Sequence, residues 1–165
     1  MTQHRLPRSL RLDSSDLYVF ATAAEPGEWA VSGAFAFANR DAADLEANLD
    51  AKEKLALANG WLGTDSFGYS SLVEIAEIDE AGYFAVVERL ARHFVERYGA
   101  PGLAEALPVA RREVDDASEL CTHKTGTLLA VERDFDEKGQ LLERFRVIRP
   151  ERAEDHAKIW EIVED

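Results

Sequence analysis

Apolar and polar residues alternate along parts of the chain in a way that predicts β-strands. From Trp29 to Phe37, bulky residues fall on one face and small residues on the other, which predicts a strand with one face in the core. Tyr69–Ile78 is rich in β-forming residues and predicts a second long strand. The shorter run Leu17–Thr22, followed by a turn at Glu25–Glu28, predicts a strand ahead of both.

The last third of the chain predicts three further strands. Thr127–Phe135 and Leu141–Ile148 read as a hairpin around Asp136–Gly139, whose glycine suits a bulged turn that needs φ > 0. Ala157–Val163 predicts a terminal strand that closes the sheet.

Three segments have the spacing or the caps of helices. Asp41–Asn59 predicts a weakly amphipathic helix. Asp79 can cap a second helix, whose apolar residues recur at helical spacing until Gly99 ends it. Two prolines divide the region that follows into a short helical turn over Pro101–Ala106 and a longer helix from Pro108 to about Leu120.

These elements follow the order β-β-α-β-α-α-β-β-β. Because hairpins predominate, we expect an α+β fold with a mostly antiparallel sheet of about five to six strands and two to three helices packed on one face. A length of 165 residues favours a single domain over 1–165. The sequence leaves open whether its basic lead, residues 1–11, orders against the body or stays flexible.

Charge and composition restrict the partners and the compartment. With 19 basic and 32 acidic residues the formal net charge is −13, so we expect neither a nucleic acid nor a membrane as partner. The single cysteine, Cys121, excludes an internal disulfide framework. We find no apolar run of the kind that signal peptides or membrane spans need, and expect a cytoplasmic protein.

The segment Gly60–Ser71 has the composition of a recognition site. It holds three glycines and three aromatic rings between a predicted helix and a predicted strand. Glycine permits φ > 0 or close approach, and rings with hydroxyls make an adaptable binding surface. The candidate ligand-binding residues are therefore Trp61, Phe67, Tyr69 and Ser70. The alternative is a tight connection whose rings fill the edge of the core.

Cys121 and His123 form the most catalytic-looking pair, because a thiol near an imidazole can become a nucleophile or a metal ligand. The structural interpretation is favoured. Cys121 falls on the apolar stripe of its helix, and the negative end of the helix dipole raises the pKa of a thiol there. The histidines are scattered without zinc-site spacing, so we expect no metal and no cofactor.

Three phrases, Glu25–Phe35, Gly68–Val73 and Leu120–Thr127, resemble a small proteobacterial protein family of unknown function. The resemblance runs from about Leu10 to Pro150. That family has no assigned activity, cofactor or catalytic residue, so the resemblance implies only a bacterial, cytoplasmic, free-standing protein.

Two functions are consistent with these patterns. With no complete catalytic constellation in the sequence, we favour a non-enzymatic accessory module that binds another protein or itself, and a homodimer formed through Ala157–Val163 is one route. The alternative is a small-molecule binder or enzyme with a pocket around Trp61–Ser71, and with Cys121 and His123 opposite. It predicts a concave pocket of at least ~300 Å³ with convergent polar groups.

Overall fold

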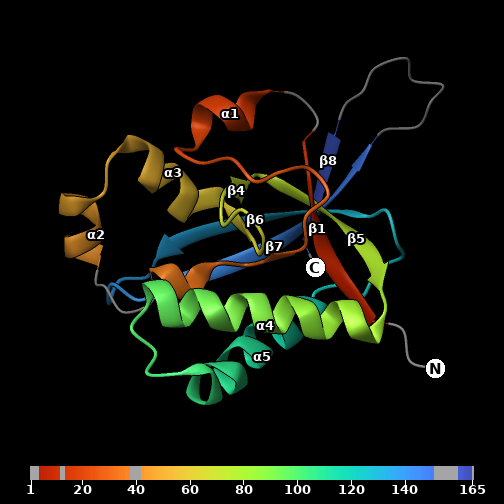
Figure 1. Cartoon of the computed structure of the whole chain (residues 1–165). Helices are drawn as coiled ribbons and strands as arrows, with labels where there is room; N and C mark the ends of the chain where they lie inside the picture. The colour runs from red at the N-terminus through yellow and green to blue at the C-terminus, as the bar shows by residue number, and fades with distance from the viewer. Residues whose placement is uncertain (1–3, 12–13, 38–41, 151–159, 165) are drawn as a thin grey trace.

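The computed structural model describes residues 4–11, 14–37, 42–150 and 160–164 (Figure 1). Its larger sheet has five antiparallel strands in the order β1-β5-β6-β7-β8: β1 (His4–Leu10), β5 (Leu72–Ile78), β6 (Leu128–Phe135), β7 (Leu141–Pro150) and β8 (Trp160–Glu164). A second, three-stranded antiparallel sheet holds β2 (Ala30–Val31), β3 (Trp61–Gly63) and β4 (Tyr69–Ser70). The α+β class and the antiparallel pairing are confirmed, but the described strands divide between two sheets where the sequence predicted one.

The α-helices of the described chain are α1 (Ser15–Val19), α2 (Ala42–Asn48), α3 (Ala51–Asn59), α4 (Glu80–Arg97) and α5 (Leu103–Glu119). Figure 1 shows α4 and α5 together beneath the sheets and α1 above them. The prediction of two to three helices on one face is therefore wrong, because the described chain has five α-helices and they lie on more than one side. Helix α4 has the predicted caps. The side chain of Asp79 accepts a hydrogen bond from the Gly82 amide at 2.7 Å, and Gly99 follows the last turn at φ +73°.

The small sheet contributes residues to two apolar clusters. In this sheet β2 pairs with β3, and Val31 lies opposite Leu62. Val31 and Leu62 belong to the apolar cluster that contains α4 and α5. Their neighbours Ala30 and Trp61 belong to the cluster of the large sheet. Both faces are therefore apolar, which explains why Trp61 is fully buried.

The N-terminal region settles one question that the sequence left open and corrects one prediction. The basic lead is ordered over β1, where Leu6 is fully buried. Arg8 of β1 forms an ion pair with Glu74 of β5, its partner in the register. The strand predicted over Leu17–Thr22 is wrong: residues 15–19 form α1. The buried Asp16 on α1 accepts hydrogen bonds from the amide and hydroxyl of Ser71, at 3.2 and 2.7 Å, and such tertiary contacts override weak strand propensity.

Three long predicted elements are each interrupted. The predicted strand Trp29–Phe37 ends after β2, because Gly33 at φ +84° turns the chain into a 3₁₀ turn. The predicted helix Asp41–Asn59 is two helices in its described part, and Asp50 begins the second with a capping box to Glu53. The predicted strand Tyr69–Ile78 is split between the two sheets as β4 and β5.

The C-terminal half is closer to the prediction. One helix, α5, runs through Pro108 where two were predicted. Packing of its buried stripe outweighs one lost backbone hydrogen bond. The β6–β7 hairpin is confirmed, with Gly139 at φ +78°. Strand β8 confirms the terminal strand over Trp160–Val163, while the predicted residues 157–159 lie outside the described chain.

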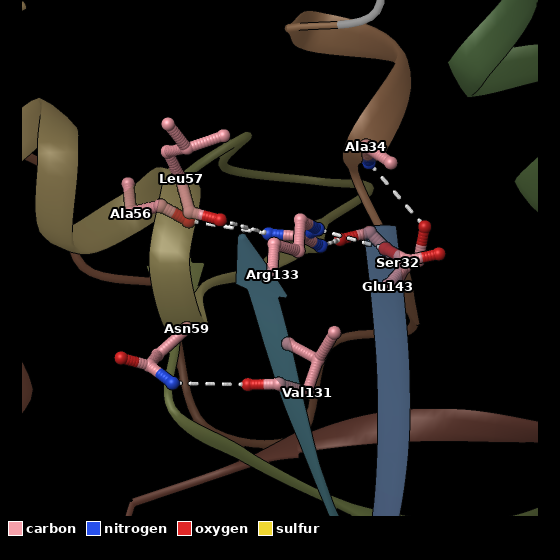
Figure 2. A network of polar contacts seen from close by, with 8 residues as sticks. All are labelled: Ser32, Ala34, Ala56, Leu57, Asn59, Val131, Arg133 and Glu143. Atoms are coloured by element: carbon pink, nitrogen blue, oxygen red, sulfur yellow. Dashed lines mark hydrogen bonds and ion pairs between the residues drawn. The ribbon is translucent and has the colours of Figure 1, made fainter. Parts of the chain in front are cut away.

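A buried arginine joins these layers (Figure 2). The side chain of Arg133 on β6 has no exposed surface, and it pairs with Glu143 of β7 at 2.7 Å. It also donates to the carbonyls of Ala56 and Leu57 at the end of α3, at 3.2 and 3.0 Å, and to the carbonyl of Ser32 after β2. These bonds hold α3 against the large sheet and so fix where the chain enters β3.

Candidate functional site

A loop from Gly63 to Gly68 connects β3 to β4 and is held by one buried carboxylate. Glu28, which is 8% exposed, lies just before β2. Its Oε1 accepts hydrogen bonds from the amides of Asp65 and Ser66, at 2.9 and 3.0 Å. Its Oε2 accepts from the Ser66 hydroxyl at 2.6 Å and from the amide of Glu25 at 2.7 Å. Four donors around one carboxylate make the loop rigid.

The glycines of this segment are needed for close approach. A Cβ added at Gly63 would fall on the Glu28 carboxylate, and one at Gly68 would lie 2.5 Å from the Ala23 carbonyl oxygen. A Cβ at Gly60 would lie 2.7 Å from a ring carbon of Tyr69. These contacts are shorter than real Cβ atoms make. Close packing therefore explains the glycine-rich composition, which in the sequence indicated a recognition site.

The rigid loop places the ring of Phe67 against α4. Phe67 has φ +56°, a left-handed conformation that is uncommon for a residue with a side chain. Its ring stacks on His93 of α4 with 3.7 Å between centroids and 5° between planes. His93 also makes an edge contact with Tyr98, at 5.4 Å between centroids. Backbone outliers of this kind cluster at functional sites, where the surrounding structure holds them.

The loop and α4 form the walls of an open cleft of about 610 Å³, which we call the α4 cleft. Residues of α4 that line it recur at helical spacing, along one edge of the apolar face. They are Arg89, Arg92, His93, Glu96 and Arg97. The opposite wall includes Ser66, Phe67 and Tyr69.

The charge of the α4 cleft is opposite to that of the whole chain. Three arginines and one glutamate line it, whereas the chain carries a net charge of −13. Arg89 faces Asp65 of the loop with 3.8 Å between Nε and Oδ1, and Arg92 lies 3.8 Å from Glu88. Both pairs are partly exposed, and such pairs stabilise a fold weakly. The guanidinium groups therefore remain available to an incoming anion.

Burial shifts the pKa of three groups in the cleft, and raises that of Tyr98. Desolvation, assisted by the charge of Arg97, lowers the pKa of His93 from its ordinary value of 6.5. The imidazole is therefore mostly neutral at pH 7. Desolvation, followed by the effect of Tyr98, raises the pKa of Tyr69 to about 12, so its hydroxyl remains a hydrogen-bond donor.

The profile of a family of unknown function, DUF6505, matches residues 3–163. The chain belongs to the DUF6505 family. This confirms the expected membership of a family of unknown function, and the proteobacterial origin stays a prediction. A comparison with curated proteins and one with solved structures each gave no match. Membership of DUF6505 assigns no reaction, so function has to be inferred from geometry.

The structure of this DUF6505 chain separates the four ligand-binding candidates into two pairs. Phe67 and Tyr69 line the α4 cleft. Trp61 and Ser70 are buried, at 0% and 2% exposed, and line none of the described part of that cleft. The indole of Trp61 instead packs on the large sheet beside Phe145, with 5.5 Å between ring centroids.

The same structure places Cys121 and His123 away from the α4 cleft. Cys121 packs in the cluster of the large sheet, and its thiol donates to the carbonyl of Ala117 at 3.6 Å. Burial raises its pKa to about 12, against a smaller opposite effect of Arg5. The thiol is thus protonated at neutral pH, unlike a nucleophilic cysteine. The carbonyl of His123 accepts a hydrogen bond from Arg5 at 2.7 Å.

The described part of this DUF6505 member offers neither a clustered metal centre nor a membrane-spanning helix. Among the described residues, no group of three or more His, Cys, Asp or Glu side chains is placed to hold a metal ion. No helix in the same part of the chain is long and apolar enough to cross a membrane.

Glu28 and the arginines of α4 are functional candidates that the sequence did not predict. Glu28 reads as part of a turn, and a charged stripe beside an apolar one is typical of any surface helix. Nothing local in the sequence distinguishes the stripe that lines a cleft from one that only meets solvent.

Proposed function

We propose that this protein is a binding module for a small organic anion held in the α4 cleft. The observation that carries the proposal is the reversal of charge: three arginines and one glutamate line the cleft of a chain with a net charge of −13. A guanidinium recognises carboxylate or phosphate oxygens through two parallel hydrogen bonds. In an otherwise acidic protein, this cleft is a favourable place for an anion to bind.

The rings of the α4 cleft support an organic ligand over an inorganic ion. Phe67, Tyr69, His93 and Tyr98 line it. Its volume of about 610 Å³ lies within the range of small-molecule sites, roughly 300–1,000 Å³. The stack of Phe67 on His93 offers a flat apolar edge beside the arginines, and rings bind other rings by offset or edge contact.

The hydroxyl of Ser66 favours binding over catalysis. It donates its proton to Glu28 at 2.6 Å and accepts the amide of Gly68 at 3.0 Å. Both bonds close the loop, so this hydroxyl has a structural role. The Glu28 carboxylate also accepts three backbone amides, whereas the base beside a nucleophile has to be free to take up its proton.

A thermal-shift titration tests the proposal. Phenyl phosphate and benzoate combine a ring with an oxyanion, and benzamide is the neutral control. At 100 times its Kd a ligand stabilises the folded state by about 2.7 kcal/mol, so the two anions should raise Tm by several degrees and benzamide should not.

Matched arginine variants locate the effect. Arg92→Gln removes one guanidinium of the cleft and should weaken binding about tenfold, as loss of a charged hydrogen bond does. Arg112→Gln removes the same charge from an exposed position on α5 and should leave the affinity unchanged. Equal shifts with benzamide, or equal losses in both variants, would contradict the proposal.

Self-association is a second candidate function, because β8 is the outermost strand of the five-stranded sheet. A sheet edge presents backbone groups that a second copy can pair with. A dimer mass by light scattering at micromolar concentration would support it, and a monomer mass would exclude it at that concentration.

A further inference from the structure

The pair of Arg89 and Asp65 is an ion pair without a hydrogen bond. The distance of 3.8 Å between Nε and Oδ1 exceeds the 2.7–3.2 Å typical of N–H···O bonds. The Nε of Arg89 is buried and has no hydrogen-bond partner among the described residues. A desolvated donor without an acceptor is unfavourable, so this N–H gains from a hydrogen bond to an oxyanion that takes the place of Asp65.

Asp65 does not depend on Arg89 for its position. Its backbone amide donates to Glu28 at 2.9 Å, which fixes the loop. Its side chain is 71% exposed, so the carboxylate can turn into solvent without disturbing the loop. Arg89 lies on a regular helix, α4. The Asp65 carboxylate can therefore move away from Arg89 while the loop and α4 both stay in place.

We infer that Asp65 occupies, in the free protein, the place of the ligand's oxyanion on Arg89, and that a bound carboxylate or phosphate displaces it. This inference rests on the proposed function. It makes Arg89 the donor to the anion and Asp65 the group that the anion displaces. The incoming oxyanion accepts the Nε–H of Arg89 at hydrogen-bond distance. Asp65 thus competes with every ligand, and it sets how tightly the cleft binds anions.

A charge-matched pair of variants tests the exchange by calorimetric titration of phenyl phosphate and benzoate. Asp65→Asn keeps the backbone bond to Glu28 and removes the competing charge. It should tighten binding about two- to fivefold, the fold-change that corresponds to an exposed ion pair. Glu137→Gln removes the same charge from an exposed turn and should bind as the wild type does.

Variants of Arg89 show whether the effect passes through the pair. Arg89→Gln should weaken binding more than tenfold, and adding Asp65→Asn to it should then have no further effect. The Nε–H resonance of Arg89 gives a readout in the wild type itself, and should move when phenyl phosphate is added.

The outcomes separate the two proposals. If the wild type binds the probes but Asp65→Asn binds them no more tightly, or the Nε–H signal stays in place, the inference is overturned and the proposed function stands. If no variant binds either probe, both are overturned. Stronger binding in Glu137→Gln, equal to that in Asp65→Asn, would show a general effect of net charge and would also overturn the inference.

Discussion

His93 packs against the ring of Phe67, and the charges of Arg97 and Glu96 shift its pKa. It stacks on Phe67 at 3.7 Å. Burial is the largest cause of its lowered pKa, Arg97 acts in the same direction, and Glu96 opposes them. The folded protein therefore binds a proton on this residue less readily than the unfolded chain does.

The pH dependence of stability follows from this difference. Between the lowered pKa of folded His93 and its ordinary value of 6.5, the unfolded chain holds more protons, so the free energy of unfolding falls as pH falls. Below the folded pKa this loss is complete. Urea denaturation at pH 7.5 and 5.0 should show a smaller drop for His93→Gln than for the wild type. Equal drops would contradict the assignment.

At the scale of elements, the position of the Gly63–Gly68 loop depends on the close approach of Glu28 to Gly63. Its three hydrogen bonds to Glu28 need the space that Gly63 leaves. Gly27, by contrast, has φ +88° and no atom within 4 Å of an added Cβ. An added Cβ would therefore cause a steric clash at Gly63 and only backbone strain at Gly27.

Alanine substitutions at these glycines test the loop. Gly63→Ala should lower the free energy of unfolding by about 3 kcal/mol, because it displaces a buried, hydrogen-bonded carboxylate. Gly27→Ala should cost only about 1 kcal/mol of backbone strain. Chemical denaturation measures both. A Gly63→Ala protein as stable as Gly27→Ala would show that Glu28 does not hold the loop.

Elements with strong local signals could be predicted from the sequence, and elements that depend on distant partners could not. Helix α4 has its cap at Asp79 and a helical apolar period, and the β6–β7 hairpin has its turn glycine. The helix break at Asp50 has a capping box that the sequence contains, but the continuous helical composition on both sides concealed it. The strand over Leu17–Thr22 failed because Ser71, far along the chain, holds Asp16.

At the scale of the whole molecule, the small sheet is the feature that positions the site. Its two faces contact the large sheet and the α4–α5 pair, so β3 and β4 bring their connecting loop to α4. The α4 cleft thus combines Ser66, Phe67 and Tyr69 with one side of α4, and Glu28 holds the loop that carries the first two. Phe67 and Tyr69 could be proposed from the sequence, because rings beside glycines are common in binding loops. The arginines could not, because only the folded structure shows which residues of α4 face the loop.

The most direct measurement is an amide chemical-shift titration of the labelled protein with phenyl phosphate. We predict that the shifts concentrate on residues 63–69 and 89–98, with saturation, and that benzamide produces none there. Shifts confined to other elements, or no saturable shift, would contradict anion binding in the α4 cleft.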